Sequence, residues 1–292
     1  IGIMVKLVRF FFIVIFLIFG VYQVKGNIFV VTSNADNGQG TLRQAITDAN
    51  SNVGLDSIYF NMPGTVFEIL LLTPLPDITE GLFIDGSTQP GSSLPANPVT
   101  LGTFGSLDHG FELRTGNIQI SNLKFTNIPT NPPNSYSGAI RSYSSGTSYG
   151  NFENIVINNN IFTNNSAGII FYNVDSLSNI RIQNNTFSGN LASVSCAGFT
   201  GLEVVSDFQF TGNSCSDTSG LWLNFRKITS LLVDSNFFSD SNRDVTVYAN
   251  RLNDSYITNN FFSNYSPMNQ AIHVDAIRAR NIFITQNEFH GY

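Results

Sequence analysis

The motif that decides the fold reads NIVINNNIF at residues 154–162, and it returns as NIRIQNNTF at 179–187 and as NIFITQNEF at 281–289. Weaker copies occupy residues 117–125, 207–215, 230–238 and 254–262. The final position is Phe in every copy except one, where Cys215 stands. Successive copies lie about 25 residues apart, and a fixed period of this size is the signature of a repeat architecture.

Each repeat contains short strands and no helix. The segments 169–172, 221–225, 245–248 and 272–275 alternate apolar and polar residues, as a strand with one buried face does. Two or three short strands per period exclude leucine-rich and TPR arrays, both of which need a different repeat unit. The sequence therefore predicts an all-β fold, a right-handed parallel β-helix with about 25 residues per coil.

Stacked coils place equivalent residues above one another, so the repeat Phe residues are expected to form an aromatic column inside the solenoid. In six of the seven copies an Asn precedes the final position by two residues. We expect these Asn residues to form a ladder at a tight turn, where Asn tolerates a left-handed backbone and bonds its own backbone. They are Asn160, Asn185, Asn213, Asn236, Asn260 and Asn287.

The first part of the chain carries a different pattern. A strand is expected at 28–32, and the TLRQ sequence at 41–44 has the form of a capping box. Leu42, Ala45, Ile46 and Ala49 then follow at helical spacing. We predict a cap region over 27–60, with a short capping helix at 41–50 that covers the first coil, and coils over 61–292. The Pro- and Ser-rich insertion at about 129–151 is predicted to be a surface loop.

The N-terminus has the form of a secretory signal peptide. Lys6 and Arg9 precede an apolar run at 10–21 that is shorter than a membrane span needs. We expect 1–26 to be the signal peptide and 27–292 the β-helix domain, which is secreted or held at the cell surface. An uncleaved anchor is the alternative, and no membrane span is expected in the mature chain. Because Tyr292 comes three residues after a repeat Phe, we also expect a chain truncated at its C-terminus.

Composition limits the classes of partner. The formal net charge is −6 and charged residues make up only 12% of the 292 residues. Without an excess of Lys and Arg to neutralise phosphates, the chain is not expected to bind nucleic acid. A hydrophobic content of 42% excludes global disorder.

The stretch 29–98 resembles the N-terminal module of secreted right-handed parallel β-helix proteins, which are common among Bacteroidota surface proteins and related to the polymorphic outer-membrane-protein type. The motifs that carry this resemblance are FVVT at 29–32, TLRQAI at 41–46 and DGSTQPG at 85–91. The resemblance implies a β-helix and export. It implies no single activity, because such proteins share none.

One outward face concentrates residues that suit a sugar. Aligning the short strand that follows the Phe in each repeat gives two expected lines of outward side chains. The first line is Ile170, Thr200, Trp222, Thr246 and His273. The second, beside it, is Tyr172, Leu202, Asn224, Tyr248 and Asp275. Aromatic faces pack on sugar rings, and neighbouring amides and carboxylates bond sugar hydroxyls. We therefore predict a polysaccharide or surface glycan as partner, held for adhesion or recognition by Trp222, Asn224, Tyr248 and Tyr172. The oligomeric state stays open.

Catalysis is the competing hypothesis, with Asp244, Asp275, His273 and Arg278 as candidate residues. Polysaccharide lyases on this fold resemble the expected architecture, and they use clustered acids for calcium and an Arg or Lys as base. A glycoside hydrolase would need two carboxylates about 5–10 Å apart. Asp244 and Asp275 are the only pair that either reaction could use, so no catalytic residue is assigned. A passive stalk is the third alternative.

No cofactor is expected, apart from the calcium that a lyase would bring. The three His residues lie on different coils and lack the spacing of a zinc site, so no metal site is predicted. Cys196 and Cys215 are separated by less than one period. Cys215 is expected to be a buried apolar residue in the Phe position, and a disulfide to Cys196 stays open because export permits one.

Overall fold

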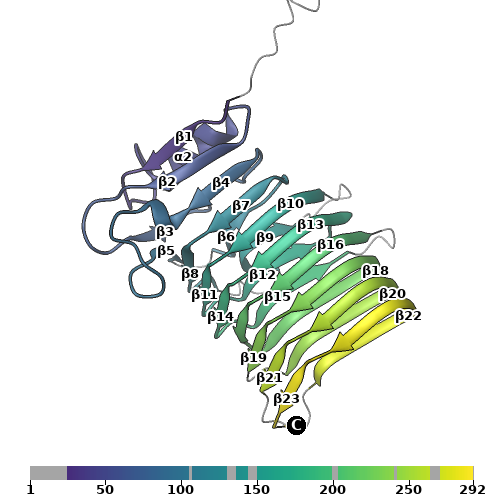
Figure 1. Cartoon of the computed structure of the whole chain (residues 1–292). Coiled ribbons are helices and arrows are strands. Elements are labelled where there is room, and N and C mark those ends of the chain that lie inside the picture. Colours follow the sequence, from purple (N-terminus) through teal and green to yellow (C-terminus); the bar gives the residue numbers. More distant parts are fainter. Residues whose placement is uncertain are drawn as a thin grey trace, which may run out of the picture.

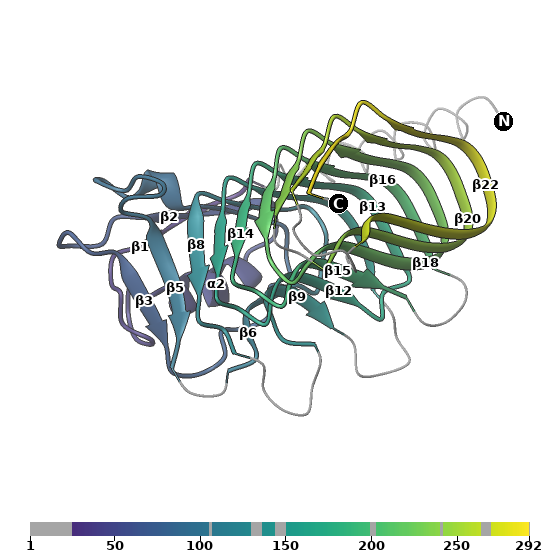
Figure 2. The same ribbon diagram turned by 90° about the horizontal axis from the view of Figure 1, so that it is seen from below.

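The structure is a computed structural model and describes residues 25–104, 107–129, 136–143, 150–198, 203–239, 242–263 and 270–291. Parallel strands stack into a solenoid, from the first coils in purple to the last in yellow (Figure 1). Viewed from below, successive coils lie one behind another (Figure 2). The predicted parallel β-helix with one short N-terminal helix is confirmed for the described part of the chain.

The strands form three rows along the solenoid. Row A contains β6 (His109–Glu112), β9 (Gly138–Tyr143), β12 (Ala167–Tyr172) and β15 (Ala192–Ala197). Row B contains β1 (Ile28–Val31), β2 (Asp56–Phe60), β4 (Leu82–Asp85), β7 (Ile118–Ser121), β10 (Asn151–Asn158), β13 (Ser176–Gln183) and β16 (Val204–Thr211). Three long strands run through both rows without a break: β18 (Ser219–Asp234), β20 (Arg243–Thr258) and β22 (Gln270–Thr285).

Row C is a separate sheet. It contains β3 (Glu68–Leu71), β5 (Val99–Thr103), β8 (Leu123–Thr126), β11 (Ile161–Thr163), β14 (Thr186–Ser188), β17 (Ser214–Ser216), β19 (Phe237–Ser239), β21 (Phe261–Ser263) and β23 (Glu288–His290). The only helices in the described ranges are α2 (Leu42–Asn50) and the 3₁₀ turn η1 (Gly86–Thr88).

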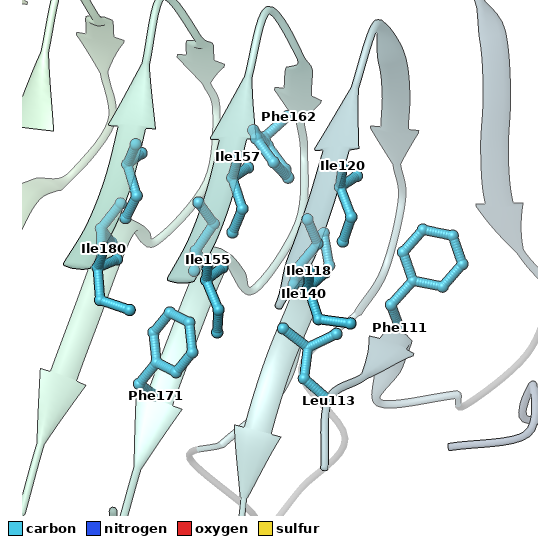
Figure 3. Packing of buried hydrophobic residues seen from close by; sticks show 14 of the residues in the cluster. Phe111, Leu113, Ile118, Ile120, Ile140, Ile155, Ile157, Phe162, Phe171 and Ile180 are labelled. Carbon is cyan, nitrogen blue, oxygen red and sulfur yellow. The ribbon is translucent and has the colours of Figure 1, made fainter. Parts of the chain in front are cut away.

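The core consists of apolar side chains stacked in register. Ile118, Ile155 and Ile180 pair across three neighbouring strands of row B and are fully buried (Figure 3). Strand period 2 sends every second residue inward, so the repeated Ile-x-Ile of the motif supplies two such columns. The alternation in the sequence is therefore the cause of the hydrophobic interior.

The predicted aromatic column is present inside row C. The ring centroids of Phe125 and Phe162 lie 5.1 Å apart with near-parallel planes, and Phe238 and Phe262 repeat this geometry at 5.1 Å. Cys215 interrupts the column. Phe210 from row B fills the gap, because its ring lies 6.2 Å from Phe238 and 6.4 Å from Phe187.

The Asn ladder joins each coil to the next. The Oδ1 of Asn213 accepts a hydrogen bond of 2.9 Å from the backbone N–H of Asn185, and the Oδ1 of Asn236 accepts one of 2.9 Å from the N–H of Asn213. The Nδ2 of Asn213 donates to the carbonyl oxygen of Ile182. All these groups are buried. Each ladder side chain thus bonds the backbone of a neighbouring coil, whereas the sequence predicted a bond to its own backbone.

The left-handed backbone lies one residue earlier than predicted. Asn159, Asn184 and Asn259 have φ of 56°, 55° and 54°, whereas the ladder Asn that follows each of them does not. The turn residue and the ladder residue therefore have separate tasks. The first reverses the chain direction, and the second satisfies the buried backbone of its neighbours.

A shorter ladder runs beside the first and ends in a carboxylate. Asn165 accepts a bond from the N–H of Ile128 and donates from its own N–H and Nδ2 to the Oδ1 of Asn190. Asn190 in turn donates from its backbone N–H and its Nδ2 to Asp217. Ser193 also donates to Asp217, at 2.9 Å. Burial of Asp217 outweighs these bonds and raises the pKa of its carboxyl group.

The cap region positions the first coil. Thr41 caps α2 by accepting from the N–H of Gln44 at 3.3 Å, and the helix buries Leu42, Ala45, Ile46 and Ala49. Residues 1–24, most of the expected signal peptide, lie outside the described residues. Within the described residues, the structure contains no helix with the length and apolarity that a bilayer crossing requires.

Two sequence expectations differ from the structure. The insertion at about 129–151 was predicted as a loop, yet its residues 138–143 form strand β9, which pairs with β6 and β12. The Pro- and Ser-rich flanks hid this strand, and 130–135 and 144–149 lie outside the described residues. Cys196 and Cys215 are both buried and free, so the disulfide alternative is not realised.

Replacing Asn213 tests the ladder. In Asn213→Ala, the buried N–H of Asn185 and the carbonyl of Ile182 lose their partners. We expect the free energy of unfolding to fall by about 1–3 kcal/mol for each group left unsatisfied, measured by urea denaturation. Asn250→Ala, at an exposed position, is the control and should change it by less than about 0.5 kcal/mol. Equal effects of the two variants would contradict a stabilising role for the ladder.

Replacing Asp217 tests the end of the shorter ladder. A raised folded-state pKa gives the parent chain its full stability below the ordinary carboxyl pKa of 3.8, and stability is lost as pH rises through the raised value. Asp217→Asn should therefore be the more stable protein near neutral pH, with a gain that shrinks toward about pH 4. Denaturation at both pH values measures the difference.

Asp234 supplies the control of opposite sign. Burial acts to raise the pKa of its carboxyl group, but hydrogen bonds from Thr258, Asn259 and Ser235 prevail and lower it. Its stabilisation is present above the ordinary pKa of 3.8 and is lost as pH falls through the lowered value. Asp234→Asn should thus lower stability near neutral pH, and a shift in the same direction as Asp217→Asn would refute the assignment.

Candidate functional site

Row A brings most of the predicted ligand-binding residues into register. Trp222 pairs with Thr246 and Thr246 with His273, while Asn224, Tyr248 and Asp275 pair along the neighbouring line. Two members of the expected lines were wrong. The positions assigned to Thr200 and Leu202, which lie outside the described residues, belong to Ser195 and Ala197.

The aromatic residues of these lines contact one another. The ring centroids of Trp222 and Tyr248 lie 6.5 Å apart at an interplanar angle of 67°, and those of Tyr248 and His273 lie 5.3 Å apart at 57°. All three side chains are half-buried. Thr246, between Trp222 and His273, is fully buried, and its Oγ1 finds no hydrogen-bond partner in the described part of the chain. We call Trp222, Tyr248 and His273 the aromatic platform.

Tyr172 belongs to a second cluster on the same row. Its hydroxyl group lies 2.6 Å from that of Tyr136, and the Tyr136 ring stacks on Tyr143 at 4.9 Å. Burial and then the bond to Tyr136 raise the pKa of Tyr172. Two strand spacings, about 10 Å, separate Tyr172 from Asn224. Tyr172 therefore does not touch the aromatic platform but extends the same face toward earlier coils.

A charged cluster of Arg141, Glu112 and Asp108 lies beside these tyrosines and was not predicted from the sequence. Arg141 is almost buried, its Nε donates to Glu112, and its Nη1 donates to Asp108 at 2.7 Å. Burial works against the charged guanidinium, but the hydrogen bonds that Arg141 donates to Glu112 and Asp108, with the charges of these carboxylates, raise its pKa. Arg141 pairs in register with Ile170, which leads through Ser195 to Trp222, so Arg141 and Trp222 belong to the same line of outward residues. Extending the aligned line by one coil would have found Arg141, had the insertion not been taken for a loop.

His109 lies at the edge of this cluster. Its Nδ1 is 2.7 Å from an Asp108 oxygen, and its Nε2 is buried without a partner among the described residues. Burial acts to raise the pKa of Asp108, but the hydrogen bonds from Arg141 and His109 outweigh it, so the net pKa is lowered. Asp108 is thus held as a carboxylate between two basic groups.

The two candidate catalytic carboxylates are not brought together. Asp244 occupies the position of Gly220 in the preceding coil, where an added Cβ would lie 2.8 Å from the Phe238 ring. Asp244 therefore belongs to the inner side of the strand and is 1% exposed. It precedes Tyr248, the partner of Asp275, by four residues or about 13 Å of strand. The pairing that calcium or a glycoside hydrolase would need is absent at these two residues.

The remaining candidates sit in different surroundings. His273 is part of the aromatic platform, and Asp275 is exposed beside it. Arg278, three residues further along β22, is exposed and lines a surface hollow with Lys227 and Arg251. Within the described residues, no three His, Cys, Asp or Glu side chains gather as a metal-binding group.

Comparison with known proteins adds a family to this geometry. A family model described as NosD, periplasmic copper-binding protein, matches residues 96–289, well over half of the chain. The chain belongs to the NosD family. The periplasmic description of the family agrees with an exported module. A search of curated proteins gave no match. The match begins near the end of the 29–98 stretch, so the resemblance of that stretch to Bacteroidota surface proteins stays a prediction.

The copper in the NosD description was tested against the donor groups of this chain. Copper takes imidazole, thiolate and thioether ligands. The Nδ1 of His109 is engaged by Asp108, and Cys196 and Cys215 are fully buried. Burial is the main cause that raises the pKa of both thiols, so they stay protonated and are poor ligands. The described residues therefore do not fit a clustered copper centre.

The Arg141 cluster yields a stability prediction. Glu112→Ala removes the more deeply buried of the two carboxylates that pair with Arg141, so that Asp108 alone remains, and it leaves the N–H of Tyr143 without its acceptor. We expect this to cost about 3 kcal/mol in free energy of unfolding. Asp77→Ala, which breaks the exposed pair to Arg114, is the matched control and should cost less than about 1 kcal/mol. Urea denaturation compares the two variants, and similar losses would show that the buried cluster adds nothing special.

Proposed function

We propose that this NosD-family chain is an extracytoplasmic β-helix module that binds a glycan along row A. The observation that carries the proposal is the aromatic platform: Trp222, Tyr248 and His273 come from three neighbouring strands and contact one another while staying half-buried. Packed rings with one accessible face are suited to the apolar face of a sugar ring.

Polar groups needed for sugar hydroxyls flank the platform. Asn224 and Asp275 pair in register with Tyr248 on either side, so an amide and a carboxylate border the same ring. A few placed polar groups among aromatic rings is the usual composition of a small-molecule or sugar site.

The second cluster favours a polymer over a single sugar. Tyr172 offers a further ring two strand spacings, about 10 Å, along the solenoid axis, and Tyr136 and Tyr143 pack around it on the side of the earlier coils. A polysaccharide chain laid along row A would meet both clusters, and each contact would add to the avidity of the other. Adhesion to, or recognition of, a surface polysaccharide is the role that follows.

Binding is favoured over catalysis by the separation of the carboxylates. Asp244 is buried on the inner side of β20, and Asp275 is exposed on the outer side of β22. General acid–base hydrolysis needs both groups at one bond. Asp275, His273 and Arg278 therefore enter the proposal as contacts for a ligand rather than as reacting groups, and calcium plays no part in it.

Trp222→Ala and Tyr248→Ala test the proposal. Purified chain would be passed over immobilised neutral and acidic polysaccharides, with and without calcium, and its retention measured. We expect a polysaccharide that retains the parent chain to lose at least about tenfold in affinity for each variant, because truncating an aromatic anchor removes a hot spot. Tyr256→Ala, an exposed ring stacked on Phe283, is the matched control and should bind normally.

Release of reducing or unsaturated ends in the same incubation would show an enzyme and overturn the binding role. Failure of the parent chain to bind any polysaccharide would favour a passive stalk. Normal binding by both variants would place the site elsewhere on the solenoid.

A further inference from the structure

A line of three cations crosses the last coils just beyond the aromatic platform. Lys227 pairs in register with Arg251, and Arg251 with Arg278. Their strands β18, β20 and β22 lie side by side in both ribbon views (Figures 1 and 2). Arg226 joins the three in lining a surface hollow of about 340 Å³. We call these four side chains the basic ladder.

Stacking like charges on neighbouring strands is unfavourable. Parallel strands lie about 4.8 Å apart, and like charges directly opposite destabilise a sheet. The chain has acids to spare, because its net charge is −6. Four other described cations take such partners: Arg43 pairs with Asp36, Arg114 with Asp77, Arg141 with Glu112 and Arg181 with Asp207. The unpaired described cations outside the ladder, Lys25, Lys124, Arg243 and Arg280, do not line the hollow.

The basic ladder has no such partners. Across the described ranges, none of its four side chains forms an ion pair with an acidic side chain, and the lining of the hollow contains no acid. The other lining residues are Val204, Asn250 and Ile277. A repulsive arrangement without internal compensation, gathered round a hollow, is what an anionic ligand would relieve.

We propose that the basic ladder binds a linear anionic polysaccharide whose carboxylates lie along the solenoid axis. The proposal deepens the glycan binding proposed above, on which it rests, by naming the class of glycan. Guanidinium forks bind carboxylates through two parallel hydrogen bonds, so Arg251 and Arg278 suit a repeating carboxylate. Arg278, a candidate base in the sequence, acts as a charged contact.

The placement of the ladder fits a shared ligand. Lys227, Arg251 and Arg278 follow Asn224, Tyr248 and Asp275 by three positions on the same strands, about 10 Å along them. Between these positions the strands pass from row A to row B, and Arg226 and Lys227 are both accessible in succession, so the ladder lies at the edge where the two rows meet. One polymer can therefore rest sugar rings on the platform and direct carboxylates to the ladder. Nucleic acid suits this surface less, because four cations on a chain of negative net charge cannot neutralise a dense run of phosphates.

The test compares two charge-matched double variants. Arg251→Gln/Arg278→Gln removes two charges from the ladder. Lys124→Gln/Arg243→Gln removes one charge from β8 and one from the start of β20, both outside the lining of the hollow. The probes are polygalacturonate, neutral dextran and single-stranded DNA, with affinity measured from about 50 to 300 mM salt. We expect the parent chain to prefer polygalacturonate, to lose that affinity as salt rises, and to lose at least about tenfold in the ladder variant only.

A thermal melt at low salt separates binding from folding. Relief of repulsion should leave the ladder variant at least as stable as the parent chain, and if it fails to fold, Arg278→Gln alone repeats the comparison. Equal affinity of the ladder variant for polygalacturonate would overturn the inference, as would DNA bound equally well through the same residues. Dextran retained as well as polygalacturonate would overturn the anionic class but leave glycan binding intact. Retention of no polysaccharide would overturn both.

Discussion

The buried Asn ladder is the constraint on which the rest of the solenoid depends. Backbone ladders alone would tolerate a slipped register, but the Oδ1 of Asn213 can reach the N–H of Asn185 only when the two coils are aligned residue for residue. A slip would leave several buried polar groups unpaired, each of them costly. The register of the coils is therefore fixed by buried hydrogen bonds. The near-parallel rings of the Phe column beside the ladder have the same alignment.

Fixed register turns a linear sequence into lines of surface chemistry. Residues one period apart become neighbours at a strand spacing, so Trp222, Thr246 and His273 form one line and Lys227, Arg251 and Arg278 another. The long strands β18, β20 and β22 carry both lines without a break, so the spacing between rings and cations is set by strand geometry rather than by loops.

The fold was predictable because the same motif recurs in successive coils of the sequence. The inward positions of the repeated Phe and Asn residues follow from the stacking of those coils. The site was predictable only where no residues are inserted. Loops of unequal length put Ser195 where Thr200 was expected, and the insertion concealed β9 and with it Arg141. Asp244 was predicted to lie on the outward face, but it is buried beside the Phe column. Which end residues of a strand are covered depends on tertiary packing, which a sequence period cannot show.

The burial of both free thiols bears on how the chain matures outside the cytoplasm. Cys196 and Cys215 are free and wholly buried within closed coils, where oxidants from solvent do not reach them. In an oxidising compartment the only interval in which they can be oxidised is before those coils close. Folding speed in the middle of the solenoid therefore competes directly with thiol oxidation, and a thiol-labelling reagent would count the molecules whose central coils are still open.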